Sequence, residues 1–171
     1  MLGLVKRRIA DMGTVKALCL GAEAEARRDG QREPGAEHFL LAALDLPDGT
    51  ARRAFMRAGA DPAGLRDAIA GQYADALAAL GLGGLGLGGL AGAPALPPAP
   101  PHPYEAAASG KEVMQALAAG RGLAEPTRLT GAHVVAIVAA MPHGVAARAL
   151  RTLGVDAETL RRAALEEAAA G

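Results

Sequence analysis

The chain has 171 residues, close to the usual length of a single domain and long enough to bury a sizeable core. Its 18 basic residues balance its 18 acidic ones, so no net charge steers it toward nucleic acid or an anionic membrane. Hydrophobic residues make up 51% of the chain but aromatic residues only 2%, and alanine and leucine dominate. This composition is typical of helices that pack around small side chains.

The first half of the chain predicts four helices joined by short turns. Residues 1–13 predict a weakly patterned lead-in helix. From Thr14 onward apolar residues recur at three- and four-residue steps, as on one face of a helix, until Gly30. A second helix starts at Pro34 and ends at Pro47, because proline cannot continue a helix.

The third and fourth helices are marked by the residues at their ends. Gly49, or the aspartate before it, opens the third helix, and Gly59 closes it as a left-handed C-cap. Asp61 is an N-cap followed by a proline at the first position of the fourth helix. Arginines of the third helix are expected to point outward, away from its alanines and phenylalanine.

The same pattern returns 95 residues later. Adding 95 to each number aligns residues 38–69 with 133–164 without a gap, and eleven of the 32 aligned residues are identical. Shared alanines mean little in an alanine-rich chain, whereas shared histidine, proline, glycine and aspartate are informative. The informative pairs are His38/His133, Pro47/Pro142, Gly49/Gly144, Gly59/Gly154 and Asp61/Asp156.

The repeat predicts that the second half is also four helices. Val134, Val135 and Val138 favour strands by propensity, but they align with a segment that has helical spacing, so a helix is expected there. Asp156 caps the last helix, which runs to about residue 169. The histidines at 38 and 133 each open the second helix of their copy and are interpreted as structural residues whose rings fix the helix start.

Residues 81–108 predict a flexible linker between the copies. The segment 81–103 is rich first in glycine and then in proline, which excludes a stable helix. The same composition argues against a membrane span, although residues 76–104 carry no charge. The glycines from Gly81 match a dinucleotide-binding fingerprint by letter, but no strand precedes them.

The fold prediction is therefore all-α. It comprises two pseudo-symmetric four-helix repeats, at 14–80 and 109–169, in one eight-helix domain over 14–171 with a Gly/Pro-rich linker between the repeats.

Motifs of catalysis or cofactor binding are missing from the sequence. The only Gly-Lys pair, at 110–111, lacks the rest of a phosphate-binding loop, so ATP hydrolysis is not expected. The histidines show no metal-ligand spacing, and the single cysteine, Cys19, cannot complete a zinc site or a disulfide. Cys19 is interpreted as a small buried hydrophobe. A lone cysteine and the lack of a signal-peptide pattern predict a cytoplasmic protein without metal or cofactor.

Sequence motifs in the two copies point to a family. The first copy contains GAEHFLLAAL, GTARRAF and AGADPAGLR, and the second contains TGAHVVAIVAA and GVAARALRTLGVDAETLR. This doubled pattern resembles the Clp N-terminal (Clp repeat) domain of Clp-type AAA+ unfoldases, and most closely the ClpC type. The resemblance covers about 14–80 and 109–169, and no ATPase motif accompanies it in this sequence.

The resemblance implies a non-catalytic, eight-helix domain that recruits client or adaptor proteins, including components of Clp proteolysis. In ClpC-type members the glutamate of each Glu-His motif is associated with recognition of phosphorylated arginine, and Glu37 is the matching residue in the first copy. A carboxylate suits a guanidinium, and amides at a helix start suit a phosphate. The second copy has Ala132 at this position, so at most one such site is expected. Glu37 alternatively is a first-turn carboxylate that the helix dipole favours.

Three functions follow as hypotheses. The chain is a stand-alone binding module for Clp clients or adaptors, or competes with a full unfoldase for them. It is a sink for small molecules that target Clp N-domains, a variant of the same fold. It is instead a small helical DNA-binding regulator that uses surface arginines; those arginines are Arg27, Arg28, Arg32, Arg52, Arg53 and Arg57.

Overall fold

The part of the chain that the structure describes is entirely helical. This computed structural model describes residues 2–82, 104–120 and 128–170, and within them it has eight α-helices, one 3-10 turn and no strand. In the first half these are α1 (Leu2–Arg28), α2 (Ala36–Leu44), α3 (Thr50–Arg57), the turn η1 (Pro62–Gly64) and α4 (Leu65–Ala79). In the second half they are α5 (Ala108–Ala118), α6 (Gly131–Ala139), α7 (Val145–Thr152) and α8 (Ala157–Ala170). The all-α prediction is confirmed.

The duplicated sequence forms a duplicated structure. Adding 95 to the bounds of α2 gives those of α6, and the same shift converts the bounds of α3 into those of α7. It also moves the start of η1 to the start of α8. The valines in α6 are helical, as the repeat predicted, because burial in the core outweighs the modest cost of β-branched residues in a helix.

Three details differ from the predicted elements. Helix α1 is continuous from Leu2, since Gly13 inside a helix costs only about 1 kcal/mol and does not interrupt it. Helix α2 ends at Leu44, three residues before Pro47, because a turn comes first. Pro62 starts a 3-10 turn rather than the α-helix itself. Most of the predicted linker, residues 83–103, lies outside the described residues.

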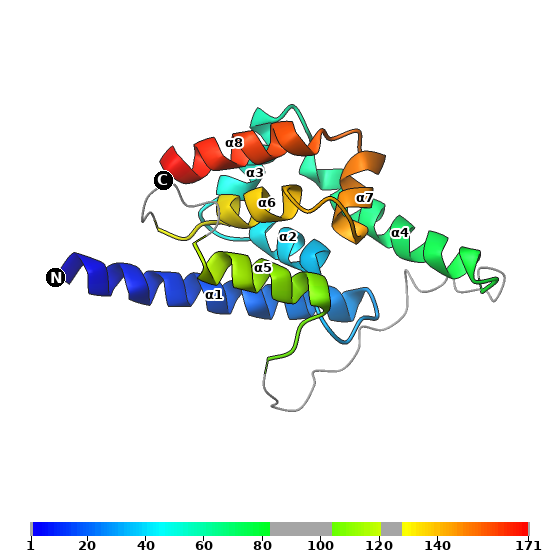
Figure 1. The fold of residues 1–171 in the computed structure, drawn as a ribbon, viewed down its shortest axis with the longest axis horizontal. Helices are drawn as coiled ribbons and strands as arrows, with labels where there is room; N and C mark the ends of the chain where they lie inside the picture. The colour runs from blue at the N-terminus through cyan, green and yellow to red at the C-terminus, as the bar shows by residue number, and fades with distance from the viewer. Residues whose placement is uncertain (1, 83–103, 121–127, 171) are drawn as a thin grey trace.

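Helices α2 and α6 form the centre of the protein. All nine residues of each are buried, and the other helices surround them, as Figure 1 shows. The start of α6 lies close to the end of α2, because a Cβ atom at Gly131 would be 2.8 Å from the carbonyl oxygen of Ala43. Glycine at this position lets the two helices approach that closely.

Each repeat packs its third helix on the fourth helix of the other repeat: α3 lies on α8 and α7 lies on α4. Equivalent polar contacts join both pairs. Arg53 Nε donates to Glu167 Oε2 at 2.8 Å, and in the equivalent pair Arg148 Nε donates to Gln72 Oε1 at 3.0 Å. Each repeat therefore supplies a packing surface for the third helix of the other.

The acceptor between α3 and α8 is a charged carboxylate, Glu167, whereas the equivalent acceptor, Gln72, is neutral. The Glu167 carboxylate is buried and also accepts from Arg57 Nε and Nη2, at 3.1 and 2.8 Å. The hydrogen bond from Arg53, together with Arg57, lowers the pKa of Glu167 below its ordinary value although burial opposes the shift.

No helix among the described residues is long and apolar enough to cross a membrane.

Glu167→Gln is expected to destabilise the fold by about 1–2 kcal/mol at neutral pH, because one buried acceptor loses its charge while the arginines stay half-exposed. The wild-type contribution exists above the unfolded pKa of the glutamate and disappears as pH falls through the lowered folded value, so the variant should also lose less stability in acid. Urea denaturation at neutral and acid pH measures both effects. Glu166→Gln, on the same helix but exposed, is the matched control and should cost less than about 0.5 kcal/mol; equal losses would refute the role of Glu167.

Candidate functional site at the start of α2

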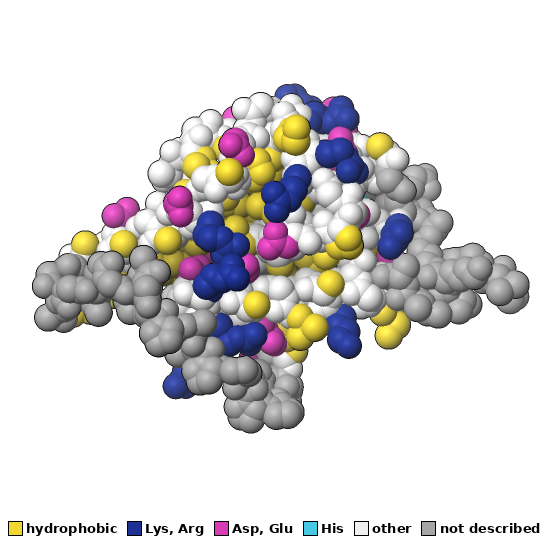
Figure 2. Space-filling model, turned by 180° about the vertical axis from the view of Figure 1, so that it is seen from behind, with side chains coloured by type: hydrophobic (Ala, Val, Ile, Leu, Met, Phe, Trp, Pro, Cys, Tyr) yellow, Lys and Arg dark blue, Asp and Glu magenta, His cyan; other side chains and the backbone are white. Residues whose placement is uncertain are grey.

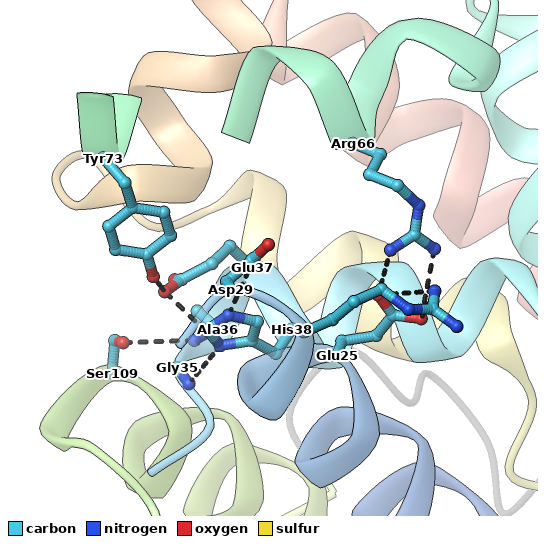
Figure 3. Close-up of polar contacts among 10 residues, drawn as sticks. Glu25, Asp29, Gly35, Ala36, Glu37, His38, Arg66, Tyr73 and Ser109 are labelled. Atoms are coloured by element: carbon cyan, nitrogen blue, oxygen red, sulfur yellow. Dashed lines mark hydrogen bonds and ion pairs between the residues drawn. The ribbon is translucent and has the colours of Figure 1, made fainter. Parts of the chain in front are cut away.

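His38 fixes the start of α2. It is fully buried, and its Nδ1 atom accepts a hydrogen bond from the backbone N–H of Gly35 at 2.9 Å. The other ring nitrogen, Nε2, therefore carries the proton and donates to Asp29 Oδ2 at 3.2 Å (Figure 3). The ring links the residue that follows α1 to the first turn of α2.

Glu37 lies beside this histidine with its carboxylate turned back over Gly35. It is 5% exposed, and its Oε1 atom accepts a hydrogen bond from the hydroxyl of Tyr73, on α4, at 2.5 Å. A Cβ atom at Gly35 would lie 2.5 Å from the same oxygen, so glycine provides the space that the carboxylate occupies. The 3.6 Å between Glu37 Oε1 and His38 Nδ1 is no ion pair, because that nitrogen accepts from the backbone.

Tyr73 covers the site from the side of α4. Its ring stacks on the His38 ring, with centroids 6.3 Å apart and planes 12° from parallel. Burial, and then the hydrogen bond to Glu37, raise the pKa of the Tyr73 phenol. The hydroxyl thus remains a donor and keeps the carboxylate shielded from solvent (Figure 3).

The second repeat contributes to the same site through Ser109, in the first turn of α5. Its hydroxyl accepts a hydrogen bond from the backbone N–H of Ala36 at 3.1 Å. Asp29, His38 and Ser109 are the residue types of a hydrolase triad, yet the ring nitrogen that would activate the serine is bonded to Gly35. The arrangement caps a helix and offers no base for nucleophilic attack.

The start of α6 has the same histidine but different capping residues. His133 Nδ1 accepts from the backbone N–H of Thr130 at 3.0 Å. Asp48 and Thr50, both from the first repeat, accept from the N–H groups of Gly131 and Ala132 at 3.2 and 2.8 Å. Where the second repeat lacks a glutamate, an aspartate of the first repeat already supplies the negative charge.

The other repeat residues lie at helix ends. The four glycines of the repeat pattern have positive φ, which an L side chain adopts only with strain: Gly49 (66°), Gly59 (72°), Gly144 (102°) and Gly154 (69°). Asp61 Oδ1 accepts from the N–H of Ala63 at 2.9 Å, and Asp156 Oδ2 accepts from the N–H of Thr159 at 2.8 Å. These six residues shape the turns at helix ends and lie away from the Glu37 site.

The arginines of the DNA-binding hypothesis are largely engaged with acidic side chains. Arg27 pairs with Glu23, Arg28 with Glu25, and Arg52 with Asp45, while Arg53 and Arg57 hold Glu167. Glu25 is itself buried and also binds Arg66, as Figure 3 shows. Figure 2 shows basic and acidic side chains interspersed on one face of the molecule rather than a continuous basic surface. This pattern does not favour a nucleic-acid footprint.

Four residues of the site were not anticipated from the sequence: Tyr73, Ser109, Asp48 and Thr50. Tyr73 has helical core spacing, so the pattern gives no hint of its hydroxyl contact. Asp48 before a helix is a capping signal, and its Oδ1 atom does accept from the N–H of Thr50, the first residue of α3, at 2.8 Å. Its other oxygen and the Thr50 hydroxyl accept from N–H groups more than 80 residues away, which the local pattern does not reveal. Cys19, expected to be buried, is only partly so, and burial raises the pKa of its thiol, which disfavours a reactive thiolate.

Comparison with known protein families gives a match over the first repeat. Residues 14–80 match the family model of the Clp repeat (R) N-terminal domain. The matched span contains most of α1 and all of α2, α3 and α4, hence Glu37, His38 and Tyr73. A search of curated proteins gives no match.

A pH titration tests the role of the histidine at the start of α6. Burial lowers the pKa of His133 below its ordinary value of 6.5. As pH falls through that value the unfolded chain takes up a proton before the folded chain does, so stability decreases toward acid pH. His133→Gln should cost about 1 kcal/mol at pH ~8 and lose less stability than the wild type between pH ~7.5 and ~5.5.

Thermal denaturation over this pH range measures the slope. His143→Gln, at an exposed position of the same repeat, should leave the slope unchanged. An identical slope in wild type and His133→Gln would show that the buried ring has no part in the pH dependence.

Proposed function

We propose that this chain, whose residues 14–80 match the family model of the Clp repeat N-terminal domain, is a non-catalytic module that recruits client or adaptor proteins. The family match over the first repeat carries the proposal. The bounds of α2 and α6, and those of α3 and α7, differ by the same 95 residues, which supports extending the proposal to the second repeat. The proposed domain then covers residues 14–171. The module would act in the cytoplasm, where Cys19 stays reduced.

The polar residues near α2 support a binding role over a catalytic one. Each titratable group at this site already has a structural partner: Asp29 holds His38, and Tyr73 holds Glu37. No group of His, Cys, Asp and Glu side chains in the described ranges is arranged to hold a metal ion. Client recruitment requires none of these groups to react.

A narrower proposal concerns Glu37 as a contact for a charged ligand such as phosphoarginine. The carboxylate accepts a hydrogen bond from Tyr73 and would accept a guanidinium as well. In the present arrangement the tyrosine covers it, and the N–H groups of Gly35 and Ala36 are bonded to His38 and Ser109. A ligand at Glu37 therefore has to displace Tyr73.

Competition with a Clp unfoldase is the direct test of the proposed function. A module that binds the same clients or adaptors should slow the degradation of an adaptor-dependent client by a purified Clp-type unfoldase and its protease, in proportion to the concentration of the full chain. Chemical crosslinking should join the chain to that client or adaptor. The proposal fails if saturating chain changes neither the degradation rate nor the crosslinking pattern.

A pair of substitutions tests the Glu37 contact. Tyr73→Phe removes the hydroxyl that covers the carboxylate, so affinity for a phosphoarginine peptide should rise about threefold or more, the equivalent of one lost hydrogen bond. Glu37→Gln should abolish that binding. Calorimetry with phosphoarginine and unmodified arginine peptides gives both affinities, and unchanged affinity in Glu37→Gln would assign this glutamate a structural role only.

A further inference from the structure

Two grooves occupy equivalent places in the two repeats. The first lies between the end of α2, α3 and the start of α4, and the second between the end of α6, α7 and the start of α8. Their lining residues correspond by the shift of 95: Leu44/Ala139, Asp45/Ala140, Arg52/Ala147, Pro62/Ala157, Ala63/Glu158 and Arg66/Arg161. The volumes differ, at about 140 Å³ in the first repeat and about 620 Å³ in the second.

The first groove is filled by the chain's own arginine. Arg52, on α3, donates from Nε to the carbonyl oxygen of Leu44 at 2.7 Å and from Nη2 to Asp45 Oδ1 at 3.1 Å. The carbonyl of Leu44 belongs to the last residue of α2, which has no later N–H in the helix to bind. The guanidinium therefore satisfies the end of the helix and lies at the negative pole of its dipole.

The second groove lacks this arginine. Ala147 stands at the position of Arg52 and Ala140 at the position of Asp45, which accounts for the larger volume. The carbonyl of Ala139, equivalent to that of Leu44, receives no side-chain hydrogen bond from any of the described residues. Met141, Leu150 and Val155 provide apolar walls for the stem of a long side chain.

The second groove has an acceptor and a negative residue for a cation. The carbonyl end of α6 and Asp156, whose carboxylate also caps α8, line it, while Glu158 and Arg161 form an ion pair at 3.3 Å. Arg151, in the last turn of α7, is exposed, and its positive charge opposes the binding of a second cation. A guanidinium can both hydrogen-bond the carbonyl and attract Asp156, whereas an aliphatic side chain leaves the carbonyl unsatisfied.

We propose that the groove between α6, α7 and the start of α8 binds an arginine side chain of a partner protein, in the pose that Arg52 takes in the first repeat. The inference rests on the proposed protein-binding function and specifies one contact of it. The groove is distinct from the Glu37 site, because neither Glu37 nor Tyr73 lines it.

Short end-capped peptides test this contact on the full chain. Peptides of alanine with one central residue, arginine in one and leucine in the other, are titrated while backbone NMR shifts are recorded. The arginine peptide should bind at least threefold more tightly and shift the signals of Ala139, Ala147 and Leu150. Equal or tighter binding of the leucine peptide, or shifts confined to other residues, would overturn the proposal.

Variants that exchange the two grooves sharpen the test. Ala140→Asp restores the carboxylate that Arg52 uses and should raise arginine-peptide affinity about threefold to tenfold, and Arg151→Gln should raise it by removing a like charge. Ala140→Asp combined with Ala147→Arg rebuilds the filled groove and should abolish binding. Arg52→Ala empties the first groove and should create a second site.

Matched thermal denaturation of each variant separates loss of the groove from loss of the fold. If the empty first groove gains no arginine-peptide binding, the analogy between the grooves is wrong. If Ala140→Asp with Ala147→Arg still competes for clients as well as the wild type, the groove inference fails while the proposed function stands. If the wild type does not compete at all but binds arginine peptides in the groove, the function fails and the site stands.

Discussion

The burial of two complete helices is the constraint on which the rest of the structure depends. Because α2 and α6 lie wholly inside the protein, the N–H groups of their first turns cannot be hydrated. Each helix therefore needs acceptors within the protein, and a buried histidine supplies the first of them in both repeats. His38 and His133 stand at equivalent positions for this reason.

The remaining acceptors come from the opposite repeat and differ between the two helices. Ser109 of the second repeat serves α2 with a neutral hydroxyl, whereas Asp48 of the first repeat serves α6 with a carboxylate. A second carboxylate at position 132 would face the charge of Asp48, so alanine there is compatible with the cap. The difference between Glu37 in the first repeat and Ala132 in the second therefore has an electrostatic explanation in addition to any difference in ligand binding.

Much of the fold could be predicted because its signals are local. Helical spacing, the prolines, the left-handed Gly59 and the aspartate cap at Asp61 each act within a few residues, and the repeat transfers them to the second half, valines included. The interior of the site could not be predicted in the same way. Tyr73 reaches Glu37 across 36 residues and Ser109 reaches Ala36 across 73, and no periodicity records which polar groups meet at such separations. The expected outward arginines are indeed exposed at Arg53 and Arg57, but their acidic partner lies in the last helix.

The exchange of third and fourth helices between repeats also bears on how the chain folds. Helical proteins usually fold fast, since most of their contacts are local in sequence. Here α3 finds its packing surface on α8, and α7 finds its own on α4, so both interfaces close loops of roughly 70–110 residues before they stabilise anything. Neither half can reach its native packing until the other is present, which makes the rate of folding depend on chain closure more than on helix formation.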